Sequence, residues 1–378
     1  MTEWIKLSLP HKGGSEMKWI EEAYRDDWFV PLGPHVDKFE NTLSEFLGSE
    51  KPVVAVSAGT AAIHLGLVML GVGKGDEVIC QSLTFSASAN PITYQGASPI
   101  FVDSEADTWN IDPIELEKAI VDRKRITGKY PKAIIVVDLY GMPAKLNEII
   151  AIANKYDIPV LEDAAEAFGS EYMGKKCGTQ TQYGTLSFNG NKIITTSGGG
   201  AIVCPSEEAA ARVKFLATQA RENRPYYYHT VTGYNYRLSN ISAAIGLGQM
   251  DNIDFRLARR RRIHEIYLKE LGSTGIISIL DNPTSDFNSN FWLTTAIISN
   301  KAKLSPDQLR VALMDKHIET RLLWRPMHMQ PIFADAPYYG TNNVSESLFN
   351  RGLCLPSGSS LTDEQILTVC CEIKKLLI

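Results

Sequence analysis

A single lysine stands between two short apolar segments in YGTLSFNGNKIITTSGGG, residues 183–200. Residues 185–188 and 201–204 have the composition of short strands, and the residues between them are mostly small, polar or glycine. Glycine and small side chains let the backbone approach a ligand closely. Most lysines are solvent-exposed, but this setting also suits a lysine that forms a Schiff base. Lys192 is therefore a candidate catalytic group.

A second candidate lies upstream, in IPVLEDAA, residues 158–165. This segment is typical of a buried strand that ends in two carboxylates. In an α/β sheet, a side chain at the carboxyl end of a strand faces the ligand crevice. An aspartate that pairs with a pyridinium nitrogen and a lysine that condenses with an aldehyde are the protein groups that pyridoxal 5′-phosphate (PLP) most needs. Asp163 and Lys192 together therefore indicate PLP chemistry.

Size and charge limit the class of protein. The chain has 378 residues, 44% hydrophobic and 21% charged, which fits a large globular domain and a smaller one. Its formal net charge of −5 provides no general attraction to nucleic acid or to an anionic membrane. We therefore expect neither partner, and any bound phosphate must be held by local groups.

The apolar runs and the cysteines indicate the compartment. The apolar runs are strand-sized, short of the roughly 20 residues that a membrane span requires. No basic segment followed by an apolar run occurs at the N-terminus, so no signal peptide is predicted. The six cysteines include no CxxC pair and no Cys/His spacing typical of zinc sites. We expect a cytoplasmic protein with reduced thiols and no metal.

Strands and helices alternate along the first half of the chain. Strands are predicted at 53–56, 77–81, 99–103, 133–138 and 158–163, with helices between them. This alternation predicts an α/β fold with a mainly parallel central sheet, helices on both faces, and active-site groups at its carboxyl edge.

Two junctions between strand and helix offer ligand contacts. The turn SAGTAA, residues 57–62, begins a helix, and free N–H groups at such a position can bind a phosphate. A capped turn without a ligand is the alternative. Phe85 begins the next helix, where its ring could stack on a pyridine with a gain of about 1 kcal/mol or simply join the core.

The character of the chain changes after Gly200. Residues 221–239 form a loop rich in tyrosine and arginine, which indicates a binding surface or an interface. A helix at 253–271 carries Arg256 and four arginines at 259–262, interpreted as a solvated face rather than a nucleic-acid site. We expect a large domain, residues 1–250, and a small C-terminal α+β domain, residues 251–378. The N-terminal segment, up to about residue 30, could pack on the small domain.

Several blocks, in order, resemble the DegT/DnrJ/EryC1/StrS family of PLP-dependent sugar aminotransferases, which have the aspartate aminotransferase-like (type I) fold. The resemblance covers nearly the whole chain. The most specific blocks are GDEVI at 75–79, GASPIFVD at 96–103, EDAA at 162–165, SFNGNK at 187–192 and GYNYR at 233–237.

The resemblance implies how the cofactor phosphate is held. The backbone of Gly59 and Thr60 and the hydroxyl of Ser187 are expected to contact it. Asn235 is similar to the family residue that reaches the phosphate of the partner subunit. A homodimer with shared active sites follows from that likeness.

The resemblance also implies roles around the cofactor ring. Phe85 stacks on it, and Lys192 bonds to it covalently. Asp163 keeps the pyridine nitrogen protonated, so that charge on the substrate carbon is delocalised. Lys192, displaced by an incoming amine, then carries a proton to and from the substrate carbon, for which it must be a neutral amine. Glu166 is expected beside the cofactor.

The expected substrates are L-glutamate and a nucleotide-linked keto-sugar. The block at 187–192 is similar to members that act on UDP-linked 4-keto-6-deoxy-N-acetylhexosamines, giving 4-amino sugars for surface glycans. Two departures leave the subclass open: Glu166 stands where the family commonly has glutamine, and SGGG at 197–200 where it commonly has GEGG.

Aromatic or basic loop residues could stack on the nucleotide base or bind the diphosphate. His328 is favoured among them, against the alternative of a histidine satisfied within its loop. The candidates are Trp28, Phe29, Arg224, Tyr226, Trp324, Arg325 and His328.

Other interpretations are a C3 aminotransferase for a dTDP-keto-sugar, an amino-acid aminotransferase, a PLP-dependent sugar dehydratase, and a non-catalytic nucleotide-sugar binding protein. An amino-acid aminotransferase needs an arginine that clamps an α-carboxylate, and none can be assigned. Lys192 counts against the dehydratase, in which histidine replaces the lysine. Intact Asp163 and Lys192 count against the binding protein.

Overall fold

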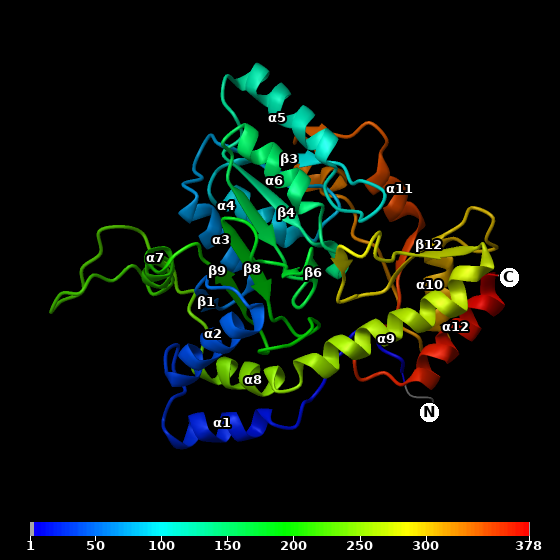
Figure 1. The fold of residues 1–378 in the computed structure, drawn as a ribbon, viewed down its shortest axis with the longest axis horizontal. Coiled ribbons are helices and arrows are strands. Elements are labelled where there is room, and N and C mark those ends of the chain that lie inside the picture. Colours follow the sequence, from blue (N-terminus) through cyan, green and yellow to red (C-terminus); the bar gives the residue numbers. More distant parts are fainter. Residues whose placement is uncertain (1–3, 378) are drawn as a thin grey trace.

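An eight-stranded sheet forms the centre of the protein in the computed structural model, which describes residues 4–377 (Figure 1). The strand order is β1 (Val53–Val56), β9 (Gly200–Val203), β8 (Tyr183–Ser187), β5 (Val160–Asp163), β4 (Ala133–Val137), β2 (Glu77–Gln81), β3 (Ser98–Val102) and β14 (Tyr338–Tyr339). β9 runs antiparallel to β1 and β8, and the other pairings are parallel. The mainly parallel sheet predicted from the sequence is confirmed.

Helices cover both faces of this sheet. One core contains residues of α3 (Gly59–Met69), α4 (Asn90–Tyr94) and α7 (Glu207–Ala217). The opposite face packs against α5 (Pro113–Thr127) and α6 (Leu146–Lys155), and against α2 (Pro34–Leu47) and α8 (Asn240–Met250). Successive strand residues point to opposite faces, so Val54 joins the α3 side and Val53 the α2 side. Burial on both faces explains why these strands are continuous apolar runs.

The C-terminal part forms a second sheet, in the order β10 (Ile277–Ile279), β12 (Thr295–Ile298), β15 (Gly352–Cys354) and β13 (Arg321–Leu322). It shares a core with α9 (Ile253–Leu271), α10 (Pro306–Met314) and α12 (Asp363–Leu377). The sequence at 290–298 predicts a strand, but β12 begins only at Thr295. Phe291 has a positive φ of 47°, and the Asn290 side chain accepts a hydrogen bond from the Trp292 N–H (2.7 Å), so a tight turn replaces the first part of the strand.

The two expected domains exchange segments. β14, which precedes α11 (Val344–Arg351), returns to the edge of the central sheet beside β3. β11 (Phe287–Asn288) pairs with β6 (Glu171–Tyr172), which in turn pairs with β7 (Lys175–Lys176). Residues 251–378 therefore do not form a self-contained unit. Within the described residues, no helix is both long enough and apolar enough to cross a membrane.

The N-terminal segment contacts both parts of the molecule. Ile5 forms a bridge with Ile318 and is buried in the core around α9 and α12. Further along, α1 (Glu16–Arg25) packs against α8 instead (Figure 1). The first residues of the described chain thus lie on the small domain, and α1 lies on the large one.

Among the arginines of α9 only Arg262 is exposed, so the interpretation of Arg256 and Arg259 to Arg261 as a solvated face is wrong. Arg256 and Arg260 are each only 1% exposed. Arg261 donates to the backbone carbonyl of Ser289 (3.1 Å), and Arg259 to that of Leu361 (3.0 Å). Loop carbonyls can satisfy guanidinium groups inside a protein, and a charge pattern in the sequence does not reveal them.

Candidate active site

A cavity of about 290 Å³ opens at the carboxyl ends of β1, β5 and β8. It is bounded on the small-domain side by Trp292 and Trp324. Many of the residues predicted from the sequence line it: Gly59, Thr60, Phe85, Asp163, Glu166, Ser187, Lys192 and Trp324. The parallel sheet brings these residues together because its strands end at one edge.

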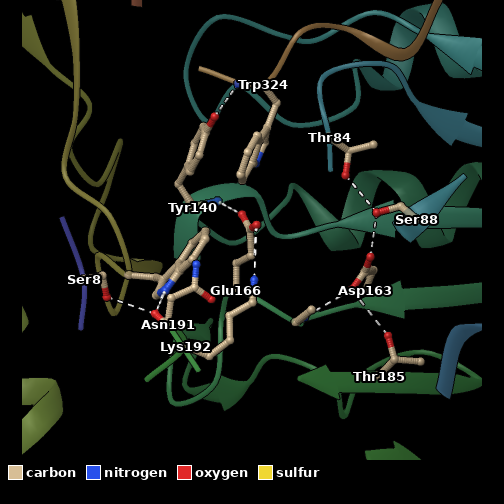
Figure 2. A network of polar contacts seen from close by, with 12 residues as sticks. Ser8, Thr84, Ser88, Tyr140, Asp163, Glu166, Thr185, Asn191, Lys192 and Trp324 are labelled. Carbon is tan, nitrogen blue, oxygen red and sulfur yellow. Dashed lines mark hydrogen bonds and ion pairs between the residues drawn. The ribbon is translucent and has the colours of Figure 1, made fainter. Parts of the chain in front are cut away.

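Lys192 lies in the wall of this cavity with its amine against a carboxylate (Figure 2). Its Nζ atom is 3.4 Å from Oε1 of Glu166 and 3.9 Å from the ring centre of Trp292. The side chains of Lys192 and Glu166 are only 13% and 5% exposed. A cation over an aromatic face and beside a carboxylate is held by both contacts, so the lysine amine has a defined position.

Glu166 is held from two sides. Its Oε2 atom accepts a hydrogen bond from the backbone N–H of Tyr140 (2.6 Å), while Oε1 faces Lys192. Tyr140 has a positive φ of 55°. Its hydroxyl accepts a hydrogen bond from the backbone N–H of Trp324 (2.8 Å). Burial raises the pKa of Glu166, and the charge of Lys192 partly opposes that rise.

Asp163 ends β5 at the floor of the cavity (Figure 2). Its Oδ2 atom accepts from the Ser88 hydroxyl (2.7 Å), and Oδ1 accepts from the Ala165 N–H (3.2 Å). The Thr84 hydroxyl contacts Ser88 in turn (2.8 Å). Burial raises the pKa of Asp163, while these hydrogen bonds favour the ionised form.

Sequence reasoning did not single out Ser88, Thr84, Tyr140 or Trp292. A weak signal existed for the first two, because short hydroxyl side chains cluster in LTFSASAN, residues 83–90. Tyr140 and Trp292 are aromatic residues in loops, and nothing local distinguishes them from core residues.

The start of α3 suits an anion. Ala58, its N-cap residue, makes no side-chain capping bond, so the first N–H groups of the helix are not capped by a side chain. A Cβ atom at Gly59 would lie 2.9 Å from the Ser187 Cβ, so only glycine lets the helix start approach that serine closely. Gly198 and Gly199 line the same cavity. A phosphate fits this cradle.

The other candidates do not line the cavity. Some lie on a projecting arm, the segment 218–239 between α7 and α8 (Asn240–Met250). Phe29 is exposed and stacks on Tyr24 with ring centres 5.7 Å apart. Arg224 and Tyr226 are exposed on the loop after α7, which projects from the body of the molecule (Figure 1). The candidates outside the cavity are Trp28, Phe29, Arg224, Tyr226, Asn235, Arg325 and His328.

His328, the favoured substrate contact, is engaged within the chain. Its Nδ1 atom lies 2.6 Å from the Ser82 hydroxyl and its Nε2 atom 3.2 Å from Oε1 of Glu346. Its ring stacks on Tyr338 at 3.7 Å. In the single chain, these contacts match the alternative interpretation, a histidine satisfied in its loop.

A buried acidic group lies behind the cavity. Glu162 precedes Asp163 on β5, so it points to the opposite side of the strand, toward Asp138 and Cys177. Ligand atoms of Asp138, Glu162 and Cys177 lie within 4.8 Å of one another. Burial raises the pKa of both carboxyl groups. Protonated carboxyls are poor metal ligands, so this group fits a proton-sharing pair better than a cation site.

The sequence pattern of the DegT/DnrJ/EryC1/StrS aminotransferase family matches residues 10–374. The chain belongs to this family. As a DegT/DnrJ/EryC1/StrS aminotransferase it is PLP-dependent, which confirms the enzyme class and cofactor expected from Lys192 and Asp163. The cavity fits that cofactor, with an anion cradle at Gly59, a buried carboxylate at Asp163 and an amine at Lys192.

Relatives support this assignment. The chain is 48% identical over 368 residues to EpsN of Bacillus subtilis (strain 168), named as a pyridoxal phosphate-dependent aminotransferase, with 97% of this chain and 94% of EpsN covered. It is 37% identical to GDP-perosamine synthase of Escherichia coli O157:H7, covering 99% and 98%. The PLP form of Spr1654 from Streptococcus pneumoniae, described as a sugar aminotransferase, superposes with a TM-score of 0.91 at 25% identity and covers both chains fully. These structural neighbours confirm the expected PLP-dependent transferase fold.

Proposed function

We propose that this protein transfers the amino group of L-glutamate to C4 of a UDP-linked 4-keto-6-deoxy-N-acetylhexosamine, for the synthesis of surface polysaccharide. The observation that carries the amino-transfer site is the convergence of Lys192, Asp163 and the uncapped start of α3 on one cavity. A keto-sugar as acceptor is supported by the relatives named for sugar chemistry. The UDP-sugar subclass rests on the block SFNGNK at 187–192.

The residues of the cavity divide the work of holding PLP. Gly59 and Thr60 would offer backbone N–H groups to the phosphate, and Ser187 its hydroxyl. Phe85 would flank the ring, and Asp163 would pair with the ring nitrogen. When bound, the cofactor supplies an electron sink for the substrate carbon.

Proton transfer falls to Lys192 and its carboxylate neighbour. Lys192 Nζ is the base that takes a proton from the substrate carbon and returns one. Glu166 Oε1, 3.4 Å away, holds or accepts the proton of that amine. Trp292 and Trp324 line this part of the cavity. They would exclude water from it, where a stray proton donor would compete.

We also propose a homodimer with shared sites. The arm after α7 exposes Tyr226 (61%) and Tyr227 (78%), and the loop after α1 exposes Phe29. Exposed aromatic clusters of this kind mark protein interfaces. Asn235 lies exposed at the base of the arm, bridged to Thr218. In the dimer, the arm would bring Asn235 to the partner's cofactor phosphate and Arg224 and Tyr226 to its substrate.

A GDP-linked 4-keto sugar is the second candidate acceptor. The 37% identity to a GDP-perosamine synthase over nearly the whole chain favours it. A dTDP-linked 3-keto sugar, the expectation for a C3 enzyme, is a further comparison.

A substrate panel tests the proposal. The holoenzyme is incubated with L-glutamate and UDP-, GDP- or dTDP-linked keto-sugars, and each product is characterised by NMR. We expect amination at C4 and a preference for the UDP-linked N-acetyl sugar. Preferred turnover of a GDP-linked sugar would replace the UDP assignment, and formation of a deoxy product without nitrogen would indicate a dehydratase. No reaction with any keto-sugar, but turnover of a 2-oxo acid, would indicate an amino-acid aminotransferase.

A further inference from the structure

Arg260 is a fully buried arginine where three segments of the chain meet. From α9 its Nη1 atom donates to the backbone carbonyl of Trp292, and also to that of Ser357 (3.1 Å). Its Nη2 atom donates to the Ser8 hydroxyl (3.0 Å). One side chain thus ties the N-terminal segment to two loops of the small domain.

Two of the residues that Arg260 contacts, Ser8 and Trp292, also bond to the loop that carries Lys192. The Ser8 hydroxyl donates to the carbonyl of Asn191 (2.9 Å). The indole N–H of Trp292 donates to the same carbonyl (2.7 Å), and its ring lies 3.9 Å from Lys192 Nζ. Figure 2 shows Ser8 beside Asn191 and the adjoining Lys192. Two chains of contacts from Arg260, one through Ser8 and one through Trp292, therefore meet at one oxygen atom next to Lys192.

A buried arginine is a costly way to hold a core together. Desolvation of a charge is offset only where oxygen acceptors surround it, and apolar residues of similar volume often stabilise a protein as well. Burial and the neighbouring Arg256 lower the pKa of Arg260 to about 9, which still leaves the guanidinium charged at neutral pH. The directional bonds of Arg260 are therefore better explained by precise placement of what they hold than by stability.

We propose that Arg260 is a positioning residue for Lys192, acting through Ser8 and Trp292 on the carbonyl of Asn191. The N-terminal segment is then part of the active-site support, although it lies far from Lys192 in sequence. This inference rests on the proposed role of Lys192 in binding the cofactor.

A double-mutant cycle tests the two chains of contacts, through Ser8 and through Trp292. Ser8→Ala removes one donor to Asn191, and Trp292→Phe removes the other while keeping an aromatic ring under the amine. The rate of PLP loss from the holoenzyme is followed as the decay of its visible absorption, together with the position of that band, without any sugar present. Because either donor alone can hold the carbonyl, the double variant should lose PLP at least about threefold faster than the product of the single effects predicts.

Matched controls separate positioning from stability. Ser15→Ala removes a similar bond from the same segment, to the carbonyl of Gly248 (3.2 Å), and should leave PLP retention unchanged. Arg260→Lys should speed PLP loss and shift the visible band, whereas Arg259→Lys, on the same helix but bonded to Leu361, should do neither.

Two results would overturn the proposal. One is a set of single effects that simply multiply in the double variant. The other is an Arg260→Lys protein that folds, with wild-type PLP retention and spectrum. If Arg260→Lys does not fold, the Ser8 and Trp292 cycle decides alone. Failure of the proposed function is distinguishable, because then Lys192→Ala itself would retain the visible band.

Discussion

Oε1 of Glu166 lies 3.4 Å from Nζ of Lys192, and only 13% of the lysine side chain and 5% of the glutamate side chain are exposed. The other oxygen of this carboxylate is fixed by the N–H of Tyr140. Glu166 can therefore not turn away to solvent, and it must either carry a negative charge beside the lysine or hold a proton. The protonation state of Glu166 therefore affects whether Lys192 can pass a proton to it.

Glu166→Gln tests this coupling. Burial raises the pKa of Glu166 above its usual value of about 4.3, so the carboxyl ionises at a higher pH than an exposed glutamate does. Only the ionised form accepts a proton from Lys192, so its contribution is absent below that pKa and present above it. We expect kcat to fall by about tenfold or more in the variant, and the acidic limb due to Glu166 to disappear from the pH profile.

Glu166→Gln leaves the neighbours of this side chain, Lys192, Asp163 and Tyr140, in place. The matched control alters an ion pair outside the cavity. Glu171→Gln alters a similar ion pair, with Lys176 at 3.0 Å, outside the cavity, and should keep the wild-type profile. An acidic limb that persists unchanged in Glu166→Gln would assign that limb to another group.

Lys192→Ala and Lys192→Arg should abolish activity and the yellow colour of the purified protein. Neither side chain can both bond to the cofactor and move a proton at the substrate carbon, so kcat should fall by at least about a thousandfold. Visible spectra before and after addition of L-glutamate provide the measurement. A wild-type protein that stays colourless with added PLP, or an alanine variant that still turns over, would contradict the assignment of Lys192.

The sequence was informative where strand periodicity alone decides position. Asp163 could be placed in the site because it ends a buried strand, and parallel strands end at one edge. Ser187 was expected there from the family resemblance. The pairing of Glu166 with Lys192 was not predictable in the same way. It depends on the backbone N–H of Tyr140, which holds Glu166, and on Trp292, which comes from a distant loop.

Arg260 shows a different limit. A run of arginines on a helix is usually a solvated face, and helical spacing cannot say whether backbone carbonyls lie opposite it. Those carbonyls, at Trp292 and Ser357, belong to turns far along the chain. Long-range packing therefore decided the part of the site that local patterns left open.

Subunit mixing tests the shared active site. If Asn235 serves the partner's cofactor, Asn235→Ala damages the site that contains the partner's Lys192. In a mixed dimer of Asn235→Ala and Lys192→Ala chains, one active site carries both substitutions. The other active site carries neither and is intact. Activity should recover to a fraction of wild type when the inactive variants are mixed after dissociation, measured by glutamate turnover. Two inactive parents that fail to complement, while forming mixed dimers by mass, would argue for independent sites.

Asp138→Asn addresses the acidic pair behind the cavity. Burial raises the pKa of Asp138 and of Glu162 in the folded state, so the folded protein binds protons more tightly than the unfolded chain. The free energy of unfolding should then fall as the pH rises above the usual carboxyl range, by up to about 1.4 kcal/mol per pH unit for each group. An asparagine keeps an acceptor for the Ala144 N–H (2.9 Å) and can donate to Glu162 without a titrating proton. The free energy of unfolding, measured with urea across a pH series, should decline less steeply with pH in the variant than in the wild type.

Asp122→Asn is a control with the opposite pH dependence. Contacts with Tyr339 and Arg125 lower the pKa of Asp122, so its stabilising effect is present at high pH and is lost as the pH falls. Parallel pH curves for Asp138→Asn and wild type would show that Asp138 does not hold the buried proton.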